Sequence, residues 1–259
     1  GPLTFQPSEL FKFAAIVYLA FSLANPRRDI AKLRDLFIPY APLIGAGLIL
    51  TLLEPDLGRT MIMFVIVVAM LFLAGARIKH LATAFLPLAG IASFVVFVLG
   101  YKRARVIDYL AAIQDPLTGS YQSSQAALTI GSGGLFGLGL GEGTQKLFFL
   151  PYPHTDFIFA ATGQEFGFVG LLVLLLLLLT IIYRGLKIAT AQPDKFGYLL
   201  ASGMALSIFV NVAINIGVVT SLIPVTGSPL PFISYGGSSL VVNCAAVGVL
   251  LNLSRRMVK

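Results

Sequence analysis

Charged residues are scarce in this sequence, and their scarcity excludes an ordinary water-soluble domain. Aspartate, glutamate, lysine and arginine make up 11% of the 259 residues, whereas soluble domains carry about 25%. Hydrophobic residues make up 57%, and they fall in blocks close to the roughly 20 residues that a helix needs to cross a bilayer. The composition therefore predicts an all-α polytopic membrane protein.

Cysteine and histidine are also rare, which excludes two kinds of site. The single cysteine, Cys244, lies in an apolar stretch, so the sequence contains no internal disulfide framework. The two histidines, His80 and His154, form no Cys/His cluster with metal-ligand spacing. The first residues also lack the basic segment and cleavage site that are typical of a signal peptide.

Seven membrane spans are predicted, at residues 8–24, 39–53, 60–75, 81–99, 157–183, 198–220 and 237–253. The net charge of +7 comes from short clusters between these blocks, which is typical of membrane orientation rather than of nucleic-acid binding. Most lysines and arginines fall in one set of alternating loops, around Arg27, Arg77, Arg184 and Arg255. The positive-inside rule places these loops in the cytoplasm. Most acidic residues lie in or near the opposite loops or inside spans, so function is expected at the outer face.

Two segments break the pattern of spans and short loops. Residues 100–156 form one long extracytoplasmic loop, and loops of this length are often functional. Val106, Ile107, Leu110 and Ile113 recur in it at helical spacing, so we expect amphipathic helices on the outer membrane surface. Residues 221–237 combine prolines and glycines with apolar side chains. Irregular backbone at membrane depth needs protein or a wet cavity beside it, so this segment is predicted to be re-entrant.

Glu9 and Lys12 open the first span in the sequence QPSELFK, residues 6–12. Pro7 suits a first helical turn, and residues three apart share a helix face and can pair. One interpretation is a structural ion pair with a snorkelling lysine. The other is a wet, charged notch at the outer end of a helix, because ionisable groups within the membrane tend to be functional.

Asp156 follows PYPHT, residues 151–155, at the outer edge of the leucine-rich span. Aspartate is a favoured helix cap, so capping alone could explain it. A carboxylate fixed where polar and apolar media meet could instead act as a general base. His154 is a candidate for orienting a substrate or Asp156. Glu165 is expected on the opposite helix face from Asp156, because nine residues separate them, so the two are not assigned to one dyad.

Residues 130–143 are rich in glycine but contain no complete nucleotide-binding motif. Glycines allow close backbone approach, and a tightly packed loop is favoured over direct ligand contact. Asn211, Asn215 and Asn243 are expected to join helices through amide hydrogen bonds.

Taken together, these segments resemble the SEDS family of bacterial peptidoglycan polymerases, the FtsW, RodA and SpoVE group. The matching motifs are FQPSELFK at residues 5–12, EPDLG at 54–58, YQ at 121–122, GSGGLFG at 131–137, QK at 145–146, HTDFIF at 154–159 and PLPFISYGGSS at 229–239. Their order agrees with the family. The stretches QKLFFLP, residues 145–151, and GVLLNLS, residues 248–254, look more like FtsW than RodA. Glu54 departs from the family, which usually has glutamine there.

The resemblance implies a peptidoglycan glycosyltransferase that joins lipid II to a growing glycan at the outer membrane face. The family has ten spans and the motif at Glu9 opens the fourth, so this sequence is expected to hold helices 4–10 and to lack the first three. The aspartate that matches Asp156 is the family's proposed base. Lys12, Arg105 and Lys146 are candidate cations for the departing diphosphate, and Glu9 and His154 are further substrate-binding candidates.

The resemblance also implies partners and a location. Expected partners are lipid II, a class B penicillin-binding protein (a transpeptidase) and other membrane proteins of division or elongation, with no nucleic acid. The expected location is the bacterial plasma membrane. No ligand cluster demands a metal, and a divalent cation, Mg²⁺ or Mn²⁺, at the diphosphate stays open. The alternatives are a lipid II flippase, a non-catalytic scaffold of the division or elongation complex and, more remotely, a secondary transporter.

Overall fold

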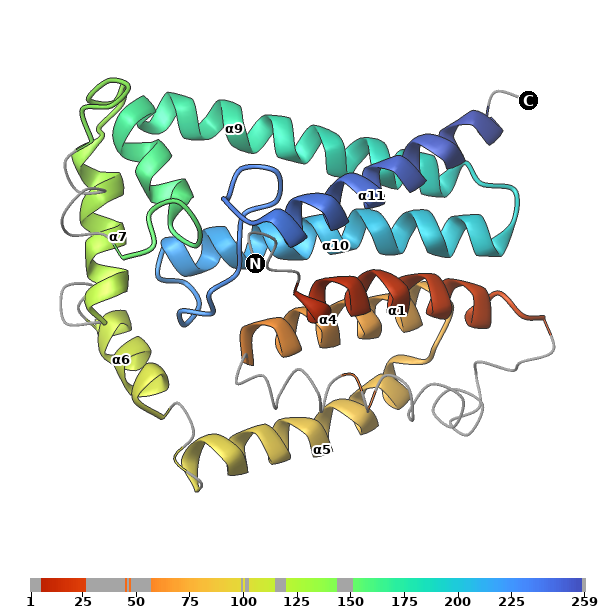
Figure 1. The fold of residues 1–259 in the computed structure, drawn as a ribbon. Helices are drawn as coiled ribbons and strands as arrows, with labels where there is room; N and C mark the ends of the chain where they lie inside the picture. Colours follow the sequence, from red (N-terminus) through yellow and green to blue (C-terminus); the bar gives the residue numbers. More distant parts are fainter. Residues whose placement is uncertain are drawn as a thin grey trace. The chain divides into compact units, whose positions relative to one another are not determined.

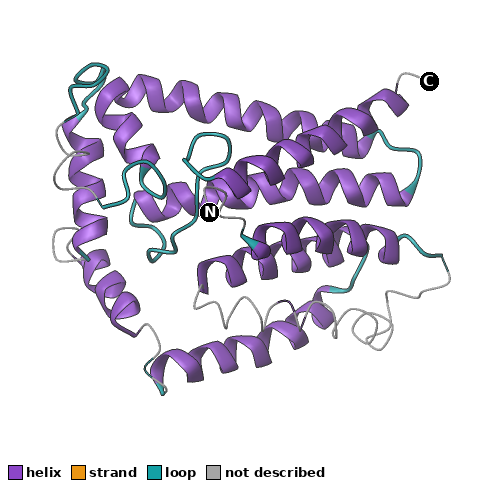
Figure 2. Cartoon of the chain, in the orientation of Figure 1, coloured by secondary structure: helices purple, strands orange, loops and turns teal. Residues whose placement is uncertain are grey.

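The computed structural model describes residues 6–26, 45, 47, 57–98, 100, 103–114, 120–143 and 151–257. Within these ranges the chain forms helices joined by turns and loops, and no strand occurs there (Figure 2). The predicted all-α class is therefore confirmed. Apart from Gly45 and Gly47, the predicted span at residues 39–53 lies outside the described residues.

The helices agree with the predicted spans to within a few residues at most ends. They are α1 (Pro7–Leu23), α4 (Leu57–Leu73), α5 (Ile78–Phe97), α6 (Arg103–Gln114), α7 (Tyr121–Ser132), α9 (Ile158–Thr190), α10 (Lys195–Val219) and α11 (Gly237–Ser254), with a short 3-10 helix η1 (Arg255–Met257). Three of the helices described, α9, α10 and α11, are long and apolar enough to cross a membrane, and Gly58–Leu73 is a shorter apolar helix. These features describe a multi-pass membrane protein.

One compact unit comprises Gly1–Ser93, Ile181–Val210 and Gly237–Lys259. In it α1 packs against α4 and α11, and Figure 1 shows α1 and α4 lying side by side. A Cβ atom on Gly203 of α10 would lie 2.6 Å from Ile16 Cγ2 and 3.0 Å from Met70 Sδ. Because a glycine stands there, α1, α4 and α10 come close enough to bury Ile16 and Met70 completely.

The second compact unit comprises Phe94–Thr180 and Asn211–Gly236. It contains α6, which confirms the helix predicted around Val106 to Ile113. It also contains α7, whose limits were not predicted. Ser120 caps α7, because its Oγ accepts the backbone N–H of Ser123 at 3.3 Å.

The glycine-rich segment after α7 packs on a kink in α9. Gly167 interrupts the helix with φ 69° and ψ −170°, so the predicted unbroken span is wrong at this point. Backbone bonds from Leu138 N to Gln164 O (3.0 Å) and from Phe168 N to Gly134 O (2.9 Å) replace helical bonds that the kink removes. The predicted tight packing of this segment is therefore confirmed.

Candidate functional site

Asp156 lies in a turn that comes before α9. Thr155 N donates to Tyr152 O at 3.2 Å and Phe157 N donates to the same oxygen at 3.4 Å, which closes the turn around Tyr152 at φ 52°. Phe157 is 1% exposed and anchors the turn in the core, whereas Asp156 is half-buried. Because α9 begins only at Ile158, Asp156 is not on the helix, and the predicted helical angle between it and Glu165 does not apply.

The irregular segment of residues 220–236 holds this turn from the other side. Asn215, near the end of α10, donates from Nδ2 to Asp156 O at 2.9 Å and to Ser228 O at 2.7 Å. Ser234 Oγ donates to Thr155 O and accepts from Leu230 N at 2.8 Å. The two segments are therefore fastened together on both sides of Asp156.

A further backbone bond, from Tyr235 N to His154 O at 2.8 Å, also joins the irregular segment to the turn before α9. The side chain of His154 is exposed, so the structure fixes its backbone while its imidazole remains accessible. His154 and Asp156 therefore share one short turn, as the sequence indicates.

Gly227 lies beside the Asp156 carboxylate. An added Cβ atom at Gly227 would come within 3.5 Å of Asp156 Oδ2, and the residue adopts φ 68°. The glycine permits the left-handed turn and places its backbone beside the carboxylate. The backbone carbonyls before and after the Asp156 Cα are thus both hydrogen-bonded, and a fixed backbone helps to position a general base.

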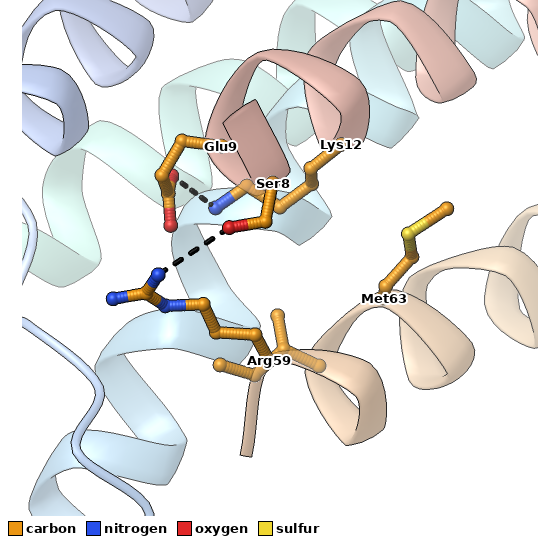
Figure 3. Close-up of a pocket in the computed structure, with 6 residues that line it drawn as sticks. Ser8, Glu9, Lys12, Arg59 and Met63 are labelled. Carbon is orange, nitrogen blue, oxygen red and sulfur yellow. Dashed lines mark hydrogen bonds and ion pairs between the residues drawn. The ribbon is translucent and has the colours of Figure 1, made fainter. Parts of the chain in front are cut away.

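A second cluster of predicted residues lies in the other compact unit, at the start of α1. Lys12 Nζ donates to Glu9 Oε2 at 2.8 Å, and both side chains are buried. This confirms the predicted pairing. Arg59 of α4 donates from Nη1 to Ser8 Oγ at 3.3 Å (Figure 3), and Gln6 N donates to Ser238 Oγ at 2.8 Å.

The hollow beside these groups is lined by Ser8, Glu9, Lys12, Arg59, Ile62 and Met63 and has a volume of about 10 Å³. A single water needs about 10–15 Å³, so this hollow by itself cannot contain a sugar or a diphosphate. Figure 3 shows the guanidinium of Arg59 and the ammonium of Lys12 approaching the same turn of α1. Among the described residues, two cations and one carboxylate therefore gather there.

The structure brings together some of the predicted site residues and leaves others untested. Glu9 and Lys12 form one pair, and His154 and Asp156 share one turn. Arg105 lies on α6, and Lys146 lies outside the described residues.

Three residues that hold the sites were not predicted for that role. Asn215 was expected to join helices, but its hydrogen bonds go to two loop carbonyls. Ser234 and Arg59 were not singled out, although both belong to or adjoin conspicuous motifs, PLPFISYGGSS and EPDLG. Their partners are distant in sequence, so only the fold reveals the contacts.

The comparisons with known proteins agree with the motifs. The family described as "Cell cycle protein", which groups FtsW, RodA and SpoVE, matches residues 1–259. Stage V sporulation protein E of Bacillus subtilis (strain 168) is 45% identical over 257 residues, covering 98% of this chain and 70% of that protein. A protein of Geobacter sp. (strain M18) named "Probable peptidoglycan glycosyltransferase FtsW" is 41% identical over 254 residues, covering 98% and 69%.

Solved structures extend the similarity to the fold. One chain, from a study of the coordination of polymerization and crosslinking by a peptidoglycan synthase complex, matches with TM-score 0.80 and 33% identity over 99% of this chain and 72% of that chain. The rod shape determining protein RodA of Thermus thermophilus matches with TM-score 0.67 and 32% identity, covering 100% of this chain and 68% of RodA. With the motifs in order and the fold shared, the chain belongs to the FtsW, RodA and SpoVE family of cell cycle proteins.

Proposed function

We propose that this protein is a peptidoglycan glycosyltransferase that polymerises lipid II at the outer face of the bacterial plasma membrane, with Asp156 as its catalytic base. The observation that carries the proposal is the double fastening of the Asp156 turn. Asn215 and Ser234 fix its backbone, and Gly227 lies beside its carboxylate. A turn whose backbone is fixed in this way limits the positions that the carboxylate can take, and such positioning lowers the barrier of the reaction.

The proposed reaction is an inverting displacement. The acceptor hydroxyl gives its proton to Asp156 as its oxygen forms a bond to the anomeric carbon of the donor. The bond from that carbon to the diphosphate oxygen breaks, and the electron pair leaves with the diphosphate. An α-linked donor then yields a β-linked glycan, because attack and departure occur on opposite faces of the carbon.

The leaving diphosphate needs positive charge, because stabilising developing charge is a large catalytic term. Lys12, Arg105 and Lys146 are proposed for this role. The ammonium of Lys12 donates to Glu9 at 2.8 Å, so Glu9 orients Lys12. The exposed His154 is proposed to contact the substrate beside the base.

No group of three or more His, Cys, Asp or Glu side chains among the described residues could hold a metal ion. Mg²⁺ at a diphosphate is usually held by one or two carboxylates and the phosphates themselves, and no step is assigned to a divalent cation.

The proposed topology follows the family. Residues 1–259 are proposed to form a single membrane domain, whose seven membrane helices correspond to helices 4–10 of the ten-helix family fold. Residues 100–156 are proposed to form the extracytoplasmic loop, and residues 221–237 a re-entrant segment. The irregular backbone there, with positive φ at Ser221, Gly227 and Phe232, supports that proposal. The proposed partner is a class B penicillin-binding protein, supported by the match to a chain of a peptidoglycan synthase complex.

The function is tested with full-length protein, purified with its transpeptidase partner and supplied with lipid II in detergent. The wild-type complex should form glycan polymer, and Asp156→Asn should abolish it while the protein stays folded, because the Asn215 bond goes to the Asp156 backbone carbonyl, which the substitution keeps. The matched control is Glu142→Gln, an exposed carboxylate of the same compact unit, which should retain activity. Polymer formation by Asp156→Asn would refute the role of Asp156 as the catalytic base. A flippase or a scaffold would form no polymer in this assay.

A further inference from the structure

A polar hollow of about 260 Å³ lies between α6, the start of α7 and the irregular segment of residues 220–236. All three walls belong to the compact unit that contains Asp156. Its volume lies slightly below the roughly 300–1,000 Å³ of typical small-molecule pockets. The hollow therefore suits one sugar ring and is too small for a complete disaccharide-peptide. Its described lining residues include Ser221, Pro224 and Val225 of this segment, but none of the residues whose hydrogen bonds hold the Asp156 turn.

Polar and apolar groups share about equally the wall that the described residues form, and most of the polar groups are neutral. Ser120, Gln122 and Ser123 contribute two hydroxyls and an amide, and Ser221 contributes a third hydroxyl. Among these described lining residues Asp108 alone carries a charge, and that charge is negative. Hydroxyls, an amide and one carboxylate suit the hydroxyl and amide groups of a neutral sugar, whereas the carboxylate would repel a diphosphate.

Ser221 is the least explained group in the wall. Its Oγ is buried and has no hydrogen-bond partner in the described part of the chain, and its backbone has φ 59°. A buried hydroxyl without a partner is costly, and a serine at positive φ is uncommon. Both costs would be offset if the hydroxyl bonded a ligand in the hollow.

The hollow shares a wall segment with the proposed base. Tyr109 of α6 donates its hydroxyl to Leu222 O at 2.8 Å, which fastens the wall in place. Five residues beyond Leu222, Gly227 lies beside Asp156 Oδ2. A ring held in the hollow would therefore be held by the same segment that flanks the carboxylate.

We infer that this hollow binds a neutral sugar ring of the glycan substrate, apart from the diphosphate, and so sets the position of the sugar relative to Asp156. The inference rests on the proposed function for the identity of the sugar.

The test uses the full-length protein with its transpeptidase partner and two variants that remove polar groups from the wall. Gln122→Leu removes the amide, and Ser221→Gly removes the hydroxyl while glycine relieves the positive φ. Gln125→Leu is the matched control, because it makes the same change at a half-buried position of α7 outside the hollow.

Two readouts are compared. Tri-N-acetylchitotriose, a neutral trisaccharide, is the binding probe, followed by saturation-transfer NMR. We expect each wall variant to weaken probe binding and to raise the KM for lipid II by about tenfold, the effect of one lost hydrogen bond, with little change in kcat. Wild type and Gln125→Leu should behave alike, and inorganic pyrophosphate should not displace the probe.

Absence of probe binding to wild type, equal binding by all variants, or displacement by pyrophosphate would overturn the inference. If wild type binds the probe through Gln122 and Ser221 but forms no polymer, the proposed polymerase function fails while the sugar site stands. If polymer forms and the KM is the same in all variants, the polymerase function stands and the sugar site fails.

Discussion

Asn215 donates both of its amide bonds to loop carbonyls, those of Asp156 and Ser228, and is itself 1% exposed. A buried side chain that satisfies two backbone acceptors fixes the loops to each other, because neither carbonyl can be left unpaired without cost. The geometry of the proposed base therefore depends on a residue of α10 that need not touch the substrate.

Replacing Asn215 should damage both stability and activity. Asn215→Leu leaves two carbonyls without this donor, which should lower the free energy of unfolding by about 2–4 kcal/mol and reduce polymerisation. The comparison is Asn243→Leu. The hydrogen bonds of Asn243 go to Ser239 of its own helix, so their loss should reduce stability and activity less. Thermal unfolding in detergent and the polymerisation assay measure the two effects. Equal behaviour of the two variants would contradict a special role for Asn215.

The net contribution of the Glu9–Lys12 pair to stability depends on two opposing free energies. Burying the two charges costs desolvation free energy, and the attraction between them offsets that cost. Lys12→Met alone leaves a buried carboxylate and should destabilise the protein by about 3–5 kcal/mol. The double variant Glu9→Leu/Lys12→Met removes both charges and should recover most of that loss. If Lys12 also binds the diphosphate, the double variant should fold yet remain inactive in the lipid II assay. A folded double variant with full activity would leave the pair a structural role only.

The kink in α9 lets one helix form an apolar span and also pair its backbone with the glycine-rich segment after α7. A strong run of leucines makes α9 the most apolar helix among the candidate spans, with mean hydropathy 2.8. Near its start the helix breaks at Gly167, and the backbone there pairs with the glycine-rich segment at Gly134 and Leu135. A Cβ on Gly167 would lie 2.3 Å from Gly137 N, so the approach requires glycine.

Substitution at this contact is therefore expected to be severe. Gly167→Ala combines strain at φ 69° with a backbone clash and should cost more than about 3 kcal/mol. Gly131→Ala in α7 meets nothing within 4 Å and should be neutral or slightly stabilising. Expression level and thermal unfolding of the two variants give the comparison. A stable Gly167→Ala protein would show that the kink is not needed for packing.

The chain taken as a whole has an orientation that follows from its lysines and arginines. With exposed Cys244 replaced, Glu142→Cys in the predicted outer loop should react with a membrane-impermeant maleimide in intact cells. Arg256→Cys, in the exposed C-terminal turn, should react only after permeabilisation, because the positive-inside rule places it in the cytoplasm. The reverse labelling pattern would overturn the outward orientation of Asp156.

Much of the architecture could be predicted because hydrophobic periodicity and length are local properties. The blocks at α1, α4, α10 and α11 begin and end close to their predicted limits. The Glu9–Lys12 pair was also predictable, because residues three apart lie on the same face of a helix. The end of α9 was less so, because it continues to Thr190 beyond the predicted limit at residue 183.

The sequence by itself determined that the chain is helical and crosses a membrane, and its motifs indicated Asp156 as the base. Only the tertiary structure decided that Asp156 lies in a turn before α9, that Asn215 and Ser234 hold this turn, and that Gly167 breaks the helix. The physical reason is the distance along the chain. Spans and pairs depend on neighbouring residues, whereas the fastening of the site joins segments about 60 to 80 residues apart, whose meeting no local pattern encodes.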